Sequence, residues 1–208
     1  MSLKRKLIVS FVCCIVFPLV IISIFSFRLY SDEIQKTVVK SSIQSNEQFN
    51  KNLDTFLGML SKLSEYPVKD SKVRSLLTKD YTTYEHPVYE KAMDRDEIKE
   101  LLYTNINSYS RMINSVMLYK ADTYELVGVT PDDSLNMSYN PSEEEWFKRI
   151  ESFEGACTIV GVHKEFQLSP RGNYVFSVGR VINSTDLSEK VLGCIIINVK
   201  INDLEKLW

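Results

Sequence analysis

An aromatic pair beside a run of carboxylates is the segment of this chain whose residue types most suggest ligand chemistry. The segment YNPSEEEWFKRI, residues 139–150, places Trp146 and Phe147 directly after three glutamates. Large aromatic side chains usually enter a core or contact a ligand, and burying carboxylates beside them is costly. Neighbours on a helix point about 100° apart. We therefore expect Trp146 to line a pocket while Phe147 packs, with core packing of both as the alternative.

A second candidate lies on the last predicted strand. Asn198 shares a strand face with Cys194 and Ile196, whereas the opposite face is entirely apolar. We expect the apolar face to pack on a long helix and the mixed face to border a pocket. A buried asparagine needs a hydrogen-bond partner, so Asn198 is a candidate ligand contact.

Three further side chains are weaker candidates, each with a structural alternative. Arg180 lies among apolar strand neighbours, so we expect a carboxylate partner, Glu144 or Glu125, and a structural ion pair as its main role. His163 ends a strand, where support of a loop is the alternative. Glu144 itself is also explained as a solvated residue of a first helical turn. The candidate ligand-binding residues are Tyr119, Tyr139, Glu144, Trp146, His163, Arg180 and Asn198.

Enzyme and metal signatures are absent from the sequence. It has no G-x-S-x-G or H-E-x-x-H motif, and its two histidines, His86 and His163, are too few and too distant for a metal site. The pair Asp132-Asp133 leaves an extracellular glycosidase as an alternative. Cys157 and Cys194 suit either a disulfide or two free thiols, and we predict free thiols. We expect no catalytic residue, cofactor or metal in this chain.

The N-terminus predicts a membrane anchor. The chain has 208 residues, a net charge of -2 and 44% hydrophobic residues, which suits one domain plus an extra element and gives no argument for nucleic-acid binding. Leu7 to Phe27 carries no charge and is long enough to cross a bilayer. Three cations precede it and only Arg28 follows, which favours a cytoplasmic N-terminus. A cleaved signal peptide is the alternative, but the apolar run is long for one.

The rest of the chain predicts helices first and strands later. Apolar residues recur every three or four positions from about Tyr30 to Glu65, which indicates one long amphipathic helix. Two shorter helices follow. After them the apolar residues recur at every second position, which is typical of strands. Ser142 is expected to cap the helix that carries Trp146. The predicted strands are 115–120, 124–129, 157–163, 174–182 and 193–200, with further helices at 71–79, 88–112 and 142–152 and hairpin loop 169–173 between strands. This order predicts an α+β fold: a long N-terminal helix packed on a five-stranded antiparallel sheet.

Several segments in this order resemble a known family. They are the N-terminal anchor, the strand pair SVMLYKADTYELVGV, the EEWF helix start, the strand FSVGRVI and the closing GCIIINVKINDL. Together they resemble the PAS-like Cache sensor domains, and most closely the double-Cache ectodomains of YesM-type bacterial sensor histidine kinases. The resemblance implies an N-terminal fragment of a receptor. Its expected parts are residues 1–6 in the cytoplasm, a 7–27 transmembrane helix, a 28–66 exit helix, a 67–200 membrane-distal Cache module and a 201–208 connector to a membrane-proximal module.

The resemblance also bears on the ligand. Cache modules that bind amino acids carry Tyr, four residues, Arg, one residue, Trp and Tyr. Here Tyr139 and Trp146 match, Phe147 stands at the final Tyr, and Glu144 stands at the arginine that pairs the ligand carboxylate. An Asp that holds the ligand ammonium is replaced by Asn198. The resemblance thus implies a site for a neutral saccharide-like or peptide ligand rather than a free amino acid.

The function implied is extracytoplasmic ligand sensing in a two-component sensor histidine kinase. An AraC-type regulator, a chemoreceptor or a cyclase with the same ectodomain is the alternative, as is a membrane-anchored scaffold without a small ligand. The resemblance further implies a homodimer through the exit helices.

Overall fold

The structure is a computed structural model that describes residues 3–106, 112–130, 136, 139–153, 155–165, 174–185 and 190–204. It divides into two compact units, 1–51 and 52–208. Helix α1 (Leu3–Lys69) belongs to both units. The predicted anchor and exit helix are therefore one continuous helix, because no Gly or Pro interrupts residues 19–57.

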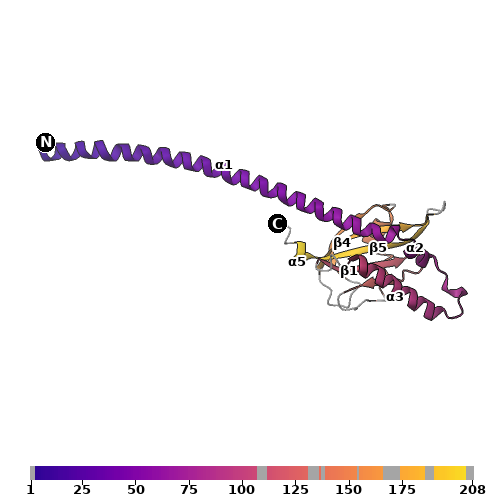
Figure 1. The fold of residues 1–208 in the computed structure, drawn as a ribbon. Helices are drawn as coiled ribbons and strands as arrows, with labels where there is room; N and C mark the ends of the chain where they lie inside the picture. The colour runs from indigo at the N-terminus through magenta and orange to yellow at the C-terminus, as the bar shows by residue number, and fades with distance from the viewer. Residues whose placement is uncertain are drawn as a thin grey trace. The chain divides into compact units, whose positions relative to one another are not determined.

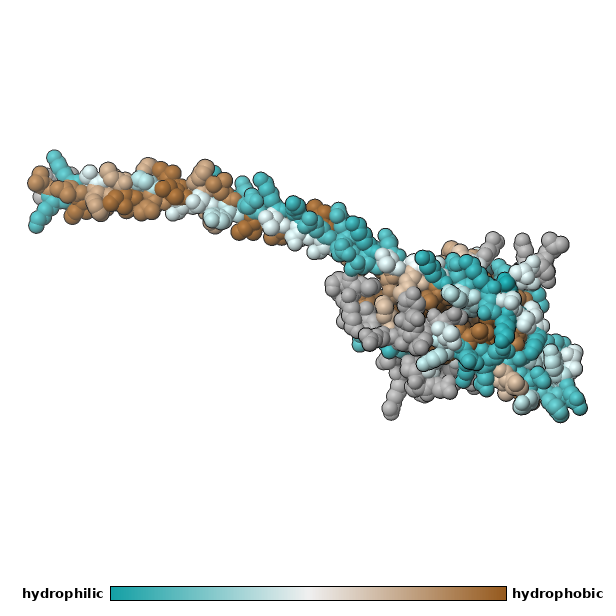
Figure 2. Space-filling view, viewed as in Figure 1, coloured by the Kyte–Doolittle hydropathy of each residue, from teal (hydrophilic) through white to brown (hydrophobic). Residues whose placement is uncertain are grey.

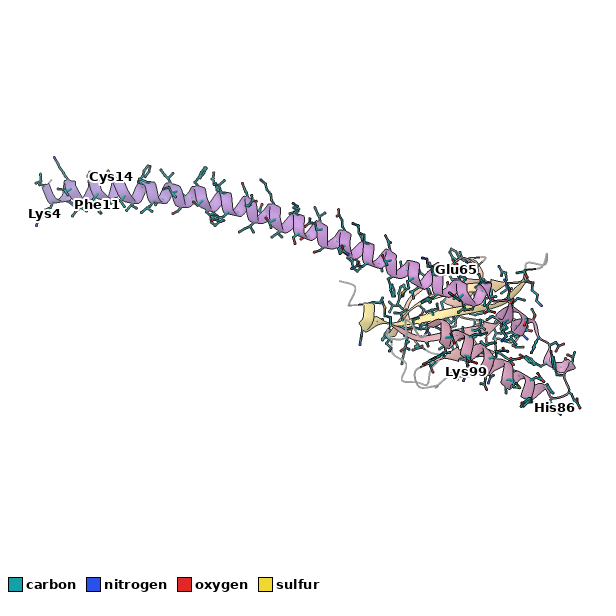
Figure 3. All side chains as sticks on the ribbon, viewed as in Figure 1. Lys4, Phe11, Cys14, Glu65, His86 and Lys99 are labelled. Atoms are coloured by element: carbon teal, nitrogen blue, oxygen red, sulfur yellow. The ribbon has the colours of Figure 1, made fainter. Side chains whose placement is uncertain are left out.

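The first unit consists of the N-terminal part of α1. Its apolar side chains are exposed, among them Leu7, Phe11 and Phe27. Figure 2 shows hydrophobic residues over this part of the helix and hydrophilic residues farther along. The helix is long and apolar enough to cross a membrane, judged by length and composition. Lys4, Phe11 and Cys14 lie along it in Figure 3.

The second unit is built on one antiparallel sheet. Its helices are the end of α1, α2 (Ser71–Thr78), the 3-10 turn η1 (Tyr81–Thr83), α3 (Pro87–Ile106), α4 (Glu145–Glu151) and α5 (Ile201–Leu204). Its strands are β1 (Ile113–Lys120), β2 (Leu126–Val129), β3 (Thr158–Lys164), β4 (Tyr174–Asn183) and β5 (Val191–Lys200). The strand order is β2-β1-β5-β4-β3, with β5 in the centre (Figure 1). The predicted α+β fold with a five-stranded antiparallel sheet is confirmed.

The two faces of the sheet bury different sets of residues. The end of α1 and helices α2 and α3 contribute to one apolar cluster, in which Ile195 and Ile197 of β5 pack with Leu60 of α1. The other face carries Met117, Tyr119, Cys194 and Ile196, and α4 covers it with Phe147 and Ile150. The sequence predicted that the side chains of β5 alternate between two different faces of the sheet. This is confirmed, because the apolar face of β5 packs on the long helix.

One predicted helix boundary, the start of α4, differs from the structure. α4 begins at Glu145 with Glu144 as its N-cap residue, and Ser142 is not the cap. The reason is an earlier turn: the Ser142 amide donates to the Asn140 Oδ1 oxygen at 3.0 Å, and the Glu144 amide donates to the Pro141 carbonyl. α3 is described from Pro87 to Ile106, and the rest of the predicted helix up to residue 111 lies outside the described residues. The predicted hairpin loop 169–173 and the pair Asp132-Asp133 lie outside the described residues.

Candidate ligand-binding site

Three polar side chains form a row across the centre of the sheet, on the face that α4 covers. In the strand register, Asn198 of β5 lies opposite Ser115 of β1 on one side and Ser177 of β4 on the other. All three are buried. The Asn198 amide Nδ2 donates to the Ser115 Oγ oxygen at 2.8 Å, and the Ser177 hydroxyl donates to Asn198 Oδ1. Each polar group of Asn198 therefore has a partner within the protein, as burial requires.

A buried carboxylate completes this row. Glu165, which follows β3, is only 2% exposed. It accepts hydrogen bonds from the Asn114 amide and the Ser115 hydroxyl, and from Asn198 Nδ2 at 3.0 Å. A carboxylate this deeply buried is tolerated because several donors compensate for lost hydration. The carboxyl group of Glu165 thus lies directly against the side-chain amide of Asn198.

A bulge in β3 brings His163 to the same face. The register between β3 and β4 shifts between Ile159 and Gly161, and Gly161 has a φ of 96°, which favours glycine. One extra residue moves every later side chain to the opposite face of the sheet. His163 therefore reaches the Ser177 Oγ oxygen with its Nε2 atom, at 2.9 Å.

Helix α4 places its two aromatic residues differently, as their 100° offset predicts. Phe147 is 2% exposed and packs edge-on against the ring of Tyr119, with 6.0 Å between centroids. Trp146 is half-buried, and its indole lies parallel to the His163 ring at a centroid distance of 6.2 Å. Phe147 thus anchors the helix, while Trp146 forms a wall above the polar row.

A groove opens beside this wall. It is lined by Glu144, Glu145, Trp146, Arg149 and Val160. Charges of both signs therefore border an aromatic face, an arrangement suited to orienting a polar ligand. The Tyr139 phenol lies near the Glu144 carboxylate, and burial, followed by that carboxylate, raises the pKa of the phenol.

The structure brings five of the seven predicted site residues together. Glu144 and Trp146 line the groove, Tyr139 lies near both of them, and His163 and Asn198 lie in the polar network behind the groove. Tyr119 lies beneath, fully buried against Phe147.

Arg180 lies on the sheet face opposite the groove, and the partner that the sequence predicted for it is wrong. It donates to Ser61 and Ser64 of α1 and to the Gly155 carbonyl, and its carboxylate neighbour is Glu65, at 3.9 Å. Neither Glu144 nor Glu125 fills that role, since Glu125 pairs with Lys91 of α3. The expected structural role of Arg180 is confirmed, with α1 as the element it holds.

Three residues of the polar network were missed by sequence reasoning. Ser115 and Ser177 alternate with apolar residues in their strands, so a polar residue on an otherwise apolar face was the available signal. Glu165 follows a strand predicted to end at His163, and nothing in its neighbourhood distinguishes it from a surface residue.

The two cysteines outside the apolar N-terminal helix segment lie in or beside the sheet without a disulfide between them. Cys157 and Cys194 are free thiols, as predicted, and burial raises the pKa of the Cys194 thiol. Within the described parts of the chain, no three His, Cys, Asp or Glu side chains gather as a metal site would require.

Comparison with known proteins gives relatives among bacterial receptors. No family model matches the chain. The methyl-accepting chemotaxis protein McpA of Bacillus subtilis is 24% identical over 205 residues, covering 99% of this chain and 27% of McpA. A probable methyl-accepting chemotaxis protein of Bacillus thuringiensis subsp. konkukian is 24% identical over 203 residues, covering 98% of this chain and 27% of its own length. The chain thus spans about a quarter of the length of the curated relatives it matches.

Solved structures show the same fold at low sequence identity. The ligand-binding domain of the Campylobacter jejuni chemoreceptor Tlp3, in complex with L-valine, matches with a TM-score of 0.57 and 12% identity over 83% of this chain and 65% of that chain. The extracellular domain of vpHK1S-Z8, described as a histidine kinase, has a TM-score of 0.55 and 10% identity over 85% and 62%. The ligand-binding domain of the Pseudomonas aeruginosa amino acid chemoreceptor PctC, in complex with GABA, has a TM-score of 0.53 and 15% identity over 76% and 62%. The fold of this chain is therefore the Cache/PAS-like α+β fold of such sensory domains.

Proposed function

We propose that this chain is the extracytoplasmic ligand-sensing region of a membrane receptor. The observation that carries the proposal is the groove beside α4: an aromatic wall with charged side chains, directly above a polar network buried in an otherwise apolar sheet. Apolar side chains of similar volume would stabilise the sheet at least as well as this buried polar network. We therefore infer that the network is retained for its function and not for stability. The likeness in fold to ligand-binding domains of receptors supports the same function.

The proposed topology follows the sequence. Residues 1–6 lie in the cytoplasm, residues 7–27 cross the membrane, and everything after Arg28 is extracytoplasmic, because the cations precede the apolar segment. Residues 28–66 then form the exit helix, 67–200 the membrane-distal sensor module and 201–208 the start of a connector. The exit helices of two copies pair in the proposed receptor.

The proposed ligand is a neutral saccharide-like molecule or a small peptide. Glu144 is exposed at the groove, where family members that bind amino acids carry an arginine, and it repels a carboxylate. Trp146 and Tyr139 supply flat apolar surface for a sugar or peptide face. The named ligands of the solved relatives, L-valine and GABA, are amino acids, so a zwitterion that uses Arg149 is the competing class.

The proposed output is a two-component histidine kinase or a chemoreceptor. The sequence resemblance favours the kinase, whereas the two curated relatives are chemotaxis proteins that align over nearly the whole chain. Translating the reading frame beyond residue 208 separates the two: a phospho-acceptor helix with an ATP-binding domain indicates the kinase, and long methyl-accepting helices indicate the chemoreceptor.

Thermal unfolding of the whole chain in lipid nanodiscs tests the sensing proposal. The chain is mixed separately with saccharides, short peptides and free amino acids. A ligand at a hundred times its dissociation constant stabilises by about 2.7 kcal/mol. We expect stabilisation by a saccharide or peptide that Trp146→Ala abolishes and Tyr89→Ala, an exposed aromatic on α3, leaves intact.

The other outcomes are informative in different ways. Stabilisation by a free amino acid, lost on Arg149→Ala, would replace the proposed ligand class and keep the sensing function. If none of the three ligand classes stabilises the chain, the sensing proposal gives way to the scaffold alternative.

A further inference from the structure

A second hollow lies on the sheet face that α2 and α3 cover, opposite the groove beside α4. Its floor is apolar and consists of Leu76 and Leu77 of α2, Ile98 of α3, Leu118 of β1 and Val127 of β2. The first four of these side chains are buried in the core of this face. The hollow has a volume of about 400 Å³ with its open mouth included, so it admits only a small molecule. Such a floor suits the apolar body of a ligand.

The rim of this hollow carries more positive than negative charge. Lys91 and Arg95 come from α3, Lys120 ends β1, and Glu125 directly precedes β2. Lys91 and Arg95 are four residues apart and therefore lie on the same face of the helix. Three cations against one carboxylate leave two positive charges in excess among the described lining residues. The rim thus favours an anion.

The carboxylates near these cations already have other partners. Glu125 forms an ion pair with Lys91. Asp94, which directly precedes Arg95 on α3, is buried. It accepts two hydrogen bonds from Lys79, at 2.7 and 2.8 Å, and a third from a tyrosine hydroxyl of η1 at 3.0 Å. Neither carboxylate is therefore left to neutralise Arg95.

Arg95 is the cation that this arrangement leaves over. Within the described part of the chain it has no hydrogen bond or ion pair. Its side chain is half-buried beside the apolar floor, where water only partly replaces a partner. A guanidinium presents its N–H donors in a planar fork that matches the two oxygens of a carboxylate. Arg95 therefore offers an anion-binding group at the edge of an apolar hollow.

Lys120 places a second cation at the same hollow. Its side chain is only 13% exposed. Its Nζ donates to the Lys79 carbonyl oxygen at 2.9 Å and lies 5.8 Å from the centre of the Tyr81 ring. The carboxylate of Asp122 is 3.5 Å away but is 57% exposed, so water weakens that pair. Mainly neutral groups thus hold Lys120 in place, and its charge is available to attract an anion.

We propose that this hollow is a second ligand site, which takes a small monocarboxylate with an apolar body. Arg95 binds the carboxylate, Lys120 adds electrostatic attraction, and Ile98 and Leu118 contact the body. A phosphate fits less well, because its additional oxygens would face apolar side chains without donors. An amine of the same shape is repelled by the cations. The site is separate from the groove beside α4, and the inference does not depend on the groove binding a ligand.

Isothermal titration calorimetry on the whole chain in lipid nanodiscs tests the proposal, with empty nanodiscs as the blank. The probe is isovalerate, a branched monocarboxylate. Isoamylamine has the same apolar body with the opposite charge, and inorganic phosphate has negative charge without an apolar body. We expect isovalerate to bind and the other two compounds not to bind.

Two variants are expected to change the dissociation constant of isovalerate in opposite directions. Arg95→Gln should raise it about tenfold or more, as loss of a charge-assisted hydrogen bond predicts. Arg74→Gln is the matched control, because Arg74 is a half-buried arginine of α2 that does not line the hollow. Glu125→Gln removes a carboxylate from the rim and releases Lys91, so the constant should fall about two- to fivefold. A variant that fails to fold cannot produce such tighter binding.

The melting temperature without ligand separates a binding role of Arg95 from a structural one. Arg95→Gln removes an unpaired cation close to two lysines, so we expect the variant to be no less stable than the unaltered chain. A lower melting temperature would show that Arg95 holds the fold, which overturns the proposal.

Four binding results would also overturn it. They are no binding of isovalerate at millimolar concentration, equally tight binding of isoamylamine or phosphate, an unchanged constant in Arg95→Gln, and weaker binding in Glu125→Gln. Trp146→Ala, a variant of the groove, shows whether isovalerate binds there instead, and loss of binding in that variant contradicts the second site.

Discussion

Nε of Arg180 on β4 donates a hydrogen bond to the Ser64 hydroxyl of α1 at 2.8 Å, across 116 residues of sequence. The same guanidinium reaches Ser61 and the Gly155 carbonyl. One cation thus fastens the end of α1 to the sheet on the face opposite the candidate site. Glu65, labelled in Figure 3, lies on the same turns of α1 and adds a carboxylate at 3.9 Å.

Replacing this cation is expected to loosen α1 from the sheet. Arg180→Met keeps most of the apolar stem and removes hydrogen bonds from a largely buried charge, so we expect unfolding free energy to fall by about 2–3 kcal/mol. Lys69→Met is the control, because Lys69 is exposed and pairs with Glu65 within the helix. Urea unfolding followed by circular dichroism measures both. Equal stability of the two variants would show that Arg180 does not hold α1.

Two glycine substitutions are expected to change stability in opposite directions. A Cβ at Gly193 would lie 2.2 Å from the backbone oxygen of Tyr119 on β1, so Gly193→Ala must separate the two strands, at a cost of about 2–3 kcal/mol. A Cβ at Gly58 in α1 meets nothing within 4 Å, so Gly58→Ala should stabilise by about 0.5–1 kcal/mol. The urea midpoints of the two variants, measured side by side, check the signs. A stable Gly193→Ala protein would contradict the close β1–β5 pairing.

The folded domain is expected to lose stability in alkali. Burial raises the pKa of the phenols of Tyr81 and Tyr139 above their usual value. A raised pKa means that the folded state retains a proton which the unfolded state loses, so this contribution is complete below about pH 10 and declines above it. The melting temperature should therefore fall as pH rises from 9 to 11.

Phenylalanine variants attribute this decline to particular phenols. Tyr139→Phe should make the melting temperature fall less steeply, because the residue that titrates is removed. Tyr66→Phe removes an exposed hydroxyl and serves as the control. If Tyr139→Phe and the unaltered chain follow the same curve, burial of the Tyr139 phenol is not the cause.

The two thiols outside the apolar helix segment should react at very different rates. Cys194 is 2% exposed and burial raises the pKa of its thiol, so little reactive thiolate forms in the folded state. Cys157 is half-buried. With Cys13 and Cys14 replaced by serine, we expect a disulfide reagent at pH 8 to label Cys157 first and Cys194 only on unfolding. Single-cysteine variants identify each signal, and simultaneous labelling would contradict the burial of Cys194.

Much of the fold was predictable from local patterns. The alternation in GCIIINVK assigned Ile195 and Ile197 to the helix-facing side and Asn198 to the other, because side chains of a strand alternate in direction. The offset between Trp146 and Phe147 on a helix was likewise enough to predict that one packs and the other lines a groove. These features depend on neighbours in sequence, so the sequence contains the information.

Features that depend on distant partners were not predictable in the same way. The predicted partner of Arg180 was wrong because its partners come from α1, more than a hundred residues away. The role of His163 was underestimated because a single extra residue at the β3 bulge changes the face on which it lies. Glu165 was missed because only the register of three strands brings it to Asn198.

The sequence by itself determined the apolar N-terminal helix, the change from period 3.6 to period 2, and the sorting of strand residues into two faces, because each follows from the spacing of apolar residues along the chain. The tertiary structure alone decided which polar residues meet. Strand order places Ser115 and Ser177 beside Asn198, and the bulge at Gly161 turns His163 toward them. The reason is that hydrogen bonds require atoms within about 3 Å, and that proximity is set by pairing between strands far apart in sequence.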